Sequence, residues 1–284
     1  DGFNTAVGHL AGDLMTTGTN NTLVGALAGD AFTDADFNIG VGKNALGSDT
    51  LGSKSTAIGT FALETQNFTT ATDALNTAVG YYAGLSVTTA THNTLIGALA
   101  GDALTTGASN VAVGYGALTT DDVGQHNVAI GRDALSALNI ATAANTYNTA
   151  VGSTAGAAVT TGVRNTLVGG LAGDALTTGS YNQAFGYGAL GTDTLGSRNT
   201  AIGQEALGTQ NFTTATDSYN VGVGHAAGGA LTTGLYNTLI GGLAGDALTD
   251  ADENVAVGQS ALTTDTKGNR NVAVGQIALA TQNF

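Results

Sequence analysis

Aspartates that recur every 72 residues are the first side chains in this sequence with a spacing that could support chemistry. One set comprises Asp30, Asp102, Asp174 and Asp246. Ca²⁺ takes six to eight oxygen ligands, so regularly spaced carboxylates could bind it. In a parallel β stack, however, these aspartates would lie four turns, about 19 Å, apart and could not share an ion. The glycine-rich nonapeptide that binds Ca²⁺ in β-helices is also absent. We interpret them as turn residues, with Ca²⁺ binding as the alternative, and expect no metal or cofactor.

A second set of aspartates is followed, five residues later, by a basic or titratable residue. The four pairs are Asp49 and Lys54, Asp121 and His126, Asp193 and Arg198, and Asp265 and Arg270. The chain has only 7 Lys and Arg in total, so this coincidence favours a function. We predict recurring ion pairs, notably Asp49–Lys54, Asp193–Arg198 and Asp265–Arg270, within a turn or between chains. The alternative is a solvated turn without pairing, and exposed pairs contribute only about 0–1 kcal/mol in any case.

Aromatic and basic residues recur immediately before an asparagine that appears throughout the chain. Members of this column include Phe37, Tyr147, Arg164, Tyr181, Tyr219 and Tyr236. Exposed rings beside arginines could stack on sugar rings, which is typical of an adhesive surface. Alternatively, these side chains cover an apolar ladder beneath them and fill grooves between chains.

Threonine pairs form another column, and a flat array of threonines is what an ice-binding protein needs. The pairs are Thr16–Thr17, Thr88–Thr89, Thr105–Thr106, Thr160–Thr161, Thr177–Thr178 and Thr232–Thr233. Threonine also favours β-strands, where its hydroxyl groups stabilise stacking. The array is interrupted at Asp34 and Asp250, so ice binding remains an alternative to a structural role.

Catalytic residues are not indicated. The 4 histidines, at positions 9, 92, 126 and 225, have no Ser and Asp partners in an arrangement that nucleophilic catalysis requires. The glycines follow short apolar segments and precede no helix, so they match no phosphate-binding loop. We therefore expect a protein that is not an enzyme.

All of these columns belong to a short repeat whose first residue, position 0, is asparagine. This residue falls at Asn4, Asn21 and Asn38, is replaced by Ser55, and resumes at Asn76. The spacings of 17, 17, 17 and 21 residues repeat along the chain, which gives a 72-residue super-repeat. We predict one continuous solenoid over 1–284, with units 1–72, 73–144, 145–216 and 217–284. The last unit is four residues short, so we expect a piece of a longer array.

Each repeat carries a fixed glycine and a fixed alanine. Glycine occupies position +4, as in Gly8 and Gly25, and alanine occupies position +7, as in Ala11 and Ala28. Glycine after two apolar residues marks a tight turn that follows a short strand. Seventeen residues are too few for two helices and cannot bury a face alone, so successive repeats must stack. The sequence predicts an all-β protein, a parallel β-solenoid or β-roll of sixteen stacked turns.

The composition agrees with a narrow core and excludes several functions. The chain has 44 Gly, no Pro, no Cys and no Trp, and a net charge of −14. Disulfides and thiolate metal sites are therefore excluded. The acidic balance disfavours nucleic acid and anionic membranes as partners. No apolar segment reaches the length of about 18 residues that a transmembrane helix needs, so we expect no membrane insertion.

Positions +2 and +3 of each repeat are both apolar, although adjacent strand residues point to opposite faces. A narrow solenoid has one interior, so one of these columns must face outward. A stripe of that length exceeds what a monomer usually exposes. We predict that the chain associates with copies of itself, most naturally as a homotrimer.

The motifs N-T-A-V-G-x-x-A-G and N-V-A-I-G-x-x-A-L, present throughout, resemble the head repeats of the YadA-like trimeric autotransporter adhesins. Similar repeats occur in phage tail fibres. The resemblance implies a left-handed, trimeric β-roll on a cell or virion surface, whose outer face binds host glycans or proteins. The repeats here are longer than the usual head repeat, and no neck, stalk or anchor motif is present. We expect a rigid structural or adhesive segment of an extracellular fibre, with a phage or virus tail-fibre shaft as the first alternative and an ice-binding solenoid as the second.

Overall fold

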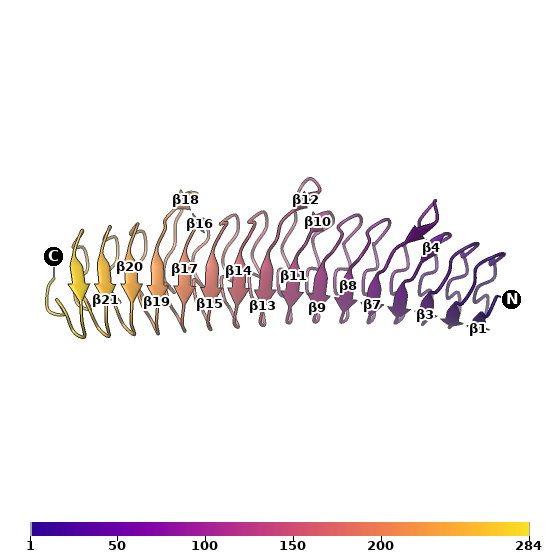
Figure 1. Cartoon of the computed structure of the whole chain (residues 1–284), viewed down its shortest axis with the longest axis horizontal. Helices are drawn as coiled ribbons and strands as arrows, with labels where there is room; N and C mark the ends of the chain where they lie inside the picture. Colours follow the sequence, from indigo (N-terminus) through magenta and orange to yellow (C-terminus); the bar gives the residue numbers. More distant parts are fainter. Residues whose placement is uncertain (1, 284) are drawn as a thin grey trace. The chain divides into compact units, whose positions relative to one another are not determined.

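A computed structural model describes residues 2–283, which form a parallel β-solenoid of about sixteen turns without any helix (Figure 1). The chain divides into two compact units, Asp1–Thr146 and Tyr147–Phe284, and each is described by itself. None of the described residues belongs to a helix that is long and apolar enough to cross a membrane.

The first unit contains one parallel sheet with a three-residue strand from every turn. Each strand pairs with the strand of the next turn along the chain. In order across the sheet, the strands are β1 (Thr5–Val7), β2 (Thr22–Val24), β3 (Ile39–Val41), β5 (Thr56–Ile58), β7 (Thr77–Val79), β8 (Thr94–Ile96), β9 (Val111–Val113) and β11 (Val128–Ile130).

The second unit repeats this arrangement with its own parallel pairs. Its strands are, in order, β13 (Thr149–Val151), β14 (Thr166–Val168), β15 (Gln183–Phe185), β17 (Thr200–Ile202), β19 (Val221–Val223), β20 (Thr238–Ile240), β21 (Val255–Val257) and β22 (Val272–Val274).

The strand register places like residues on top of one another and decides which apolar column is inside. Leu95 of β8 pairs with Ala112 of β9, and both are fully buried. Ile96, the next residue, is 39% exposed. Position +2 therefore lines the interior, where Ala129 also lies, and position +3 faces outward. The prediction that these two columns face opposite ways is correct.

The buried asparagine at position 0 closes its own turn and binds the next one. The Nδ2 group of Asn93 donates to the carbonyl oxygen of Gly107, fourteen residues later, at 3.0 Å. Its Oδ1 atom accepts a hydrogen bond from the backbone N–H of Asn110, the asparagine of the following turn, at 2.9 Å. The same closing bond recurs at most other turns, including those of Asn4, Asn21, Asn38 and Asn76.

The glycine at position +4 lies where neighbouring turns approach most closely. Gly8 and Gly25 have φ angles of 141° and 139°, which side chains strongly disfavour. A Cβ atom on Gly8 would lie 2.4 Å from the carbonyl oxygen of Gly25. No other residue could replace these glycines without separating the turns.

Besides the residue at position +2, almost every turn buries one large side chain from either position +8 or position +11. Both kinds of turn have a left-handed backbone at position +8, with φ of 55° at Gly29 and 56° at Leu46. Where position +8 is glycine, position +11 supplies the large residue, as Leu104 does after Gly101. Where position +8 is leucine, as at Leu46, position +11 is usually Asp or Gln.

The four extra residues of each long turn lie outside the main sheet, as predicted. Thr69, Thr70 and Ala71 are exposed, and Thr56 of β5 still pairs with Thr77 of β7 across the insertion. The return leg of each loop adds a two-residue pair, which the sequence did not predict. These pairs are β4 (Gly52–Ser53) with β6 (Thr72–Asp73), β10 (Gly124–Gln125) with β12 (Ala144–Asn145), and β16 (Gly196–Ser197) with β18 (Thr216–Asp217).

Candidate functional site

The residues that precede each asparagine form an exposed ladder in the second unit, along the edge where the strands begin. Its members, one per turn, are Tyr147, Arg164, Tyr181, Arg198, Tyr219, Tyr236, Glu253 and Arg270. Each has a left-handed backbone, with φ between 51° and 64°. Non-glycine residues rarely adopt this conformation, so the stacking of the turns must hold it in place. In Tyr181 the backbone N–H donates to the carbonyl oxygen of Val163 at 3.0 Å.

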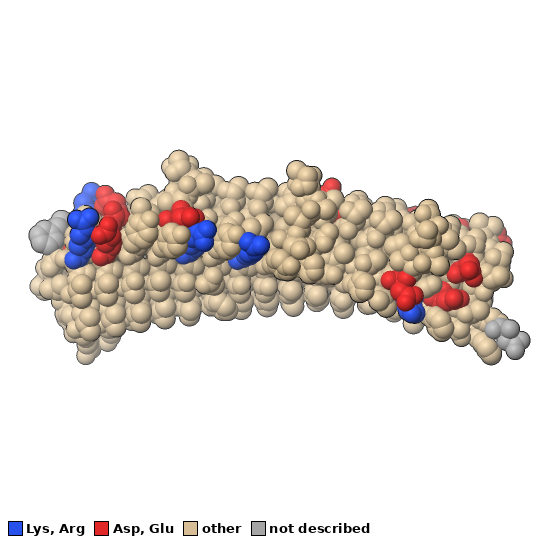
Figure 2. Space-filling model, turned by 45° about the horizontal axis from the view of Figure 1, so that its top comes forward, with Lys and Arg blue, Asp and Glu red and all other residues tan. Residues whose placement is uncertain are grey.

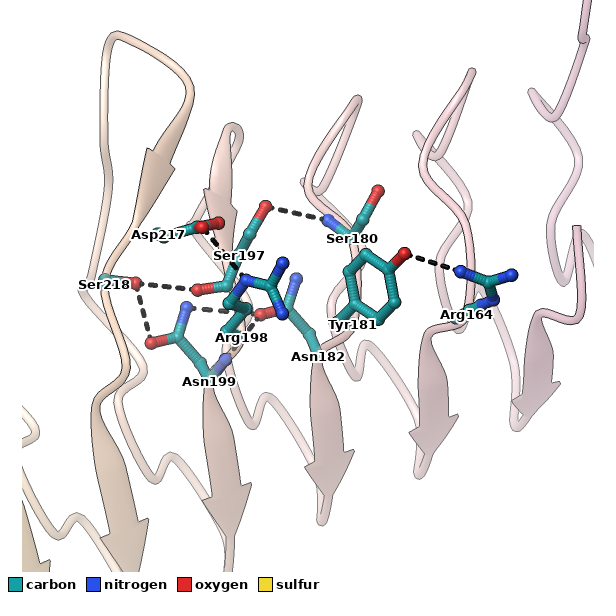
Figure 3. Close-up of polar contacts among 9 residues, drawn as sticks. All are labelled: Arg164, Ser180, Tyr181, Asn182, Ser197, Arg198, Asn199, Asp217 and Ser218. Atoms are coloured by element: carbon teal, nitrogen blue, oxygen red, sulfur yellow. Dashed lines mark hydrogen bonds and ion pairs between the residues drawn. The ribbon is translucent and has the colours of Figure 1, made fainter.

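Rings and guanidinium groups stack on each other in the middle of this ladder. The Arg164 Nη1 atom donates to the Tyr181 hydroxyl oxygen at 2.5 Å (Figure 3). The Arg198 guanidinium carbon lies 4.8 Å from the Tyr181 ring centre and 5.7 Å from that of Tyr219. Tyr219 and Tyr236 are nearly parallel, with ring centres 5.7 Å apart. Exposed cation–π contacts of this kind contribute about 0.5–1 kcal/mol each.

The ladder therefore offers edges rather than faces to a ligand. Tyr181 and Tyr219 have neighbours against their ring faces, yet they remain 36% and 45% exposed. Hydrogen bonds from hydroxyl and guanidinium groups are accordingly favoured over the ring stacking that the sequence suggested. Phe37, 55% exposed, lies in the first unit, outside this ladder.

The ion pairs predicted between Asp49 and Lys54, Asp193 and Arg198, and Asp265 and Arg270 are wrong. Lys54 pairs with Asp73 at 2.5 Å, and Arg198 pairs with Asp217 at 2.9 Å, on the return leg of a long turn in both cases. Arg270 pairs with Glu253 at 2.8 Å, which lowers the pKa of the Glu253 carboxyl. Figure 2 shows several of these charges along the edge of the sheet, while the sheet face below them is free of charge.

The aspartates at position +11 point into the interior instead. Asp49 is fully buried, and its carboxylate accepts hydrogen bonds from the Gly52 backbone N–H at 3.0 Å and from Gln66 Nε2 at 2.6 Å. Asp193 binds Gly196 and Gln210 in the same way. Asp265, also buried, binds the Gly268 backbone and the Gln282 amide. Burial raises the pKa of Asp49 and Asp193, and the hydrogen bonds partly oppose this shift.

Asp121 lacks the glutamine partner, because Leu138 stands where the other long turns have Gln66, Gln210 and Gln282. Its Oδ1 atom accepts a bond from the Gly124 N–H at 3.0 Å, but its buried Oδ2 atom has no hydrogen-bond partner. Burial raises the pKa of Asp121 to about 6. This carboxyl therefore changes charge near neutral pH.

The Ca²⁺ candidates do not gather into a site. Asp102 and Asp246 accept hydrogen bonds from the hydroxyl groups of Thr119 and Thr263 in the next turn. Burial raises the pKa of Asp30 and Asp174. Within residues 2–283, no three His, Asp or Glu side chains come together as metal ligands would.

The threonine pairs use one hydroxyl group for stacking. Thr88 and Thr105 donate to the backbone carbonyl oxygens of Thr105 and Asp122 in the following turns, each at 3.0 Å. Thr160 and Thr232 do the same. In four of the six pairs the first threonine is half-buried and only the second is exposed, whereas both are exposed at Thr16–Thr17 and Thr232–Thr233, so the regular array that ice binding needs is reduced.

Comparison of the sequence with models of known protein families gave no match, and comparison with curated proteins gave none either.

The unpaired Asp121 yields a prediction about stability. Leu138→Gln should supply the missing donor and lower the pKa of Asp121. Relative to the original chain, the variant's stability at pH 7.5 should therefore exceed its stability at pH 4.5 by up to about 3 kcal/mol, since the carboxyl pKa of the original chain lies about two units above its ordinary value. The raised pKa disfavours the ionised form. In the original chain, the loss of folding free energy caused by ionised Asp121 is therefore complete above pH 6 and disappears as the pH falls towards 4.

Denaturant unfolding of the original and variant chains at pH 7.5 and 4.5 measures this effect, and Leu138→Met, which brings no donor, is the control. An equal gain in stability at both pH values would contradict the assignment.

Proposed function

We propose that this chain is a rigid structural and adhesive segment of an extracellular fibre, an adhesin head or shaft, without catalytic activity. The observation that supports this proposal best is the outer face of each sheet. Positions +1 and +3 of the strands hold Thr, Val, Ile, Gln and Phe, and none is charged. In strands away from the ends of the sheet, the residues at position +3 are partly exposed: Ile58, Ile130 and Ile202 are 38–41% exposed.

A parallel sheet with one bare, apolar face needs a cover. Parallel sheets in proteins are normally buried on both sides, and large exposed apolar patches mark interaction surfaces. A second and third copy of the same chain would supply the same β-branched surface, so a homotrimer buries all three faces. The expected 72-residue super-repeat would give each copy the same pattern of outward loops along the fibre.

The ladder from Tyr147 to Arg270 is the proposed adhesive surface, with host glycans or proteins as ligands. The ladder lies on the edge of the sheet and stays accessible when other chains cover the sheet face. Its hydroxyl and guanidinium groups can then form hydrogen bonds with a ligand. A phage or virus tail-fibre shaft would use the same scaffold and is the principal alternative. Ice binding is less favoured, because the first threonine of each pair donates to the backbone.

The assembly can be tested by placing charge on the sheet face. Ile96→Lys with Ile130→Lys should convert an oligomer of about 83 kDa, three times the 27.8 kDa chain, into monomers, because buried charges would oppose one another at the interface. Light scattering coupled to gel filtration measures the mass, and Thr106→Lys, a charge on an exposed residue outside the sheet, is the control. A stable monomer of the original chain would overturn the proposed trimer.

The adhesive role can be tested on a glycan array. Tyr219→Ala with Tyr236→Ala removes the stacked pair and should abolish most of the binding that the original chain shows. Tyr115→Ala with Tyr187→Ala is the matched control, because these tyrosines are 57% and 56% exposed but lie outside the ladder. Equal loss in both double variants, or no binding by the original chain to glycans or to host-cell surface proteins, would argue against adhesion through the ladder.

A further inference from the structure

A groove of about 580 Å³ runs along the second unit on the edge where the turns follow the strands. Five successive turns contribute to it through positions +6, +9 and +10. Its floor is formed largely by glycine and alanine, including Gly191, Gly208 and Gly229 at position +9 and Ala226 at position +6. Because these residues have little or no side chain, the backbone of the turns is bare over this stretch.

The equivalent stretch of the first unit, 144 residues earlier, is filled. Phe61 and Tyr82 occupy the positions of Glu205 and Ala226, and their ring centres lie 5.2 Å apart. Leu85 occupies the position of Gly229. Phe61 and Tyr82 have φ angles of 61° and 60°, close to the 56° and 50° of Glu205 and Ala226. The groove therefore arises from missing side chains on a turn of the same conformation.

The groove is acidic. Asp174, Glu205 and Asp246 line it, and no Lys, Arg or His does. None of the ion pairs within residues 2–283 involves these three carboxyl groups. Asp174 also lacks the threonine hydroxyl that Asp102 and Asp246 receive, because Gly191 stands at that place. Together with a net charge of −14, this arrangement favours a cationic occupant.

The carboxylates recur at equal intervals along the axis of the stack. Two turns separate Asp174 from Glu205, and two more separate Glu205 from Asp246, a rise of about 10 Å in each case, with the aspartates at position +9 and Glu205 at position +6. A polyproline II helix has three residues per turn and rises about 3.1 Å per residue, so every third side chain lies on one side, about 9 Å apart. This repeat matches the carboxylates, whereas alternate residues of a β-strand, about 7 Å apart, do not.

We propose that this groove binds an extended basic polypeptide segment with a Lys or Arg at every third residue. The backbone of the segment lies over the glycine floor, its apolar residues contact Leu171 and Ala226, and successive cations reach Asp174, Glu205 and Asp246. The proposal goes beyond the fibre role and does not depend on it, since the groove lies within one unit of one chain.

Binding of a fluorescently labelled (Lys-Pro-Pro)3 peptide to the whole chain, followed by anisotropy, tests the proposal. We expect saturable binding that is stronger than for a Lys-Lys-Lys-(Pro)6 peptide of equal composition. Asp174→Asn and Asp246→Asn should each weaken binding, by up to about fivefold. Asp30→Asn and Asp102→Asn, the same changes at the equivalent positions of the filled first unit, should leave it unchanged.

A variant that refills the groove provides the sharpest comparison. Glu205→Phe, Ala226→Tyr and Gly229→Leu together install the side chains that the first unit carries on the same backbone, so the fold should be kept, and circular dichroism checks this. We expect this variant to lose binding. Equal binding by the refilled variant, equal affinity for both peptides, no binding at all, or preferential binding of spermidine would each overturn the proposal, the last in favour of a small polyamine.

Discussion

A buried asparagine in nearly every turn is the interaction on which the rest of this structure depends. Its amide nitrogen closes the turn to which it belongs, and its amide oxygen binds the backbone N–H of the next turn. One side chain thus fixes both the perimeter of a turn and its distance from the following one. Because an unpaired buried polar group costs about 1–3 kcal/mol, the folded state needs both bonds. The turn of Ser55 still receives the stacking bond of the turn before it, since the Ser55 N–H donates to Asn38 Oδ1 at 2.8 Å.

The narrow perimeter set by the asparagine explains the composition of the interior. Only Ala, Leu or Gly fits at position +2, and a single large side chain fits from position +8 or +11. Where Leu46 or Leu190 fills the centre from position +8, the chain places a polar residue at position +11 and satisfies it internally, as with Asp49 and Gln66. The exception is the turn with both Leu135 and Leu138, and Asp121 in the turn before it is left with an unpaired oxygen.

Much of this architecture was predictable, because the repeat has a fixed length and strand residues alternate between faces. The spacing of Asn21 and Asn38 predicts the stacking, and the apolar pair at positions +2 and +3 predicts one exposed column. The sequence did not indicate that the Asp49 side chain points into the interior, because the basic residue Lys54, five positions later, suggested an ion pair at the surface. Position +11 points into the interior in both kinds of turn, and Asp49 is satisfied there by the Gly52 N–H and by Gln66.

The two surface features of the second unit were predictable to different degrees. Aromatic and basic residues before the asparagine indicated the ladder, but not that Tyr181 and Arg198 stack on each other through a left-handed backbone. The groove depends on residues that are small, such as Gly208 and Gly229, and small residues in a glycine-rich sequence give no signal of their own. Aligning the second unit with the first, where Phe61 and Tyr82 fill the same place, would have revealed it.

Hydrogen exchange measured by NMR tests the central claim most directly, because the asparagine side-chain NH₂ groups can be observed individually. If the buried asparagines close and stack the turns, the NH₂ protons of Asn93, Asn110 and Asn182 should exchange as slowly as the backbone N–H groups of the strands. The NH₂ groups of the exposed Asn67 and Asn139 should exchange rapidly. If the NH₂ groups of the buried asparagines exchange as fast as those of Asn67 and Asn139 while the strands stay protected, the asparagines do not hold the turns together.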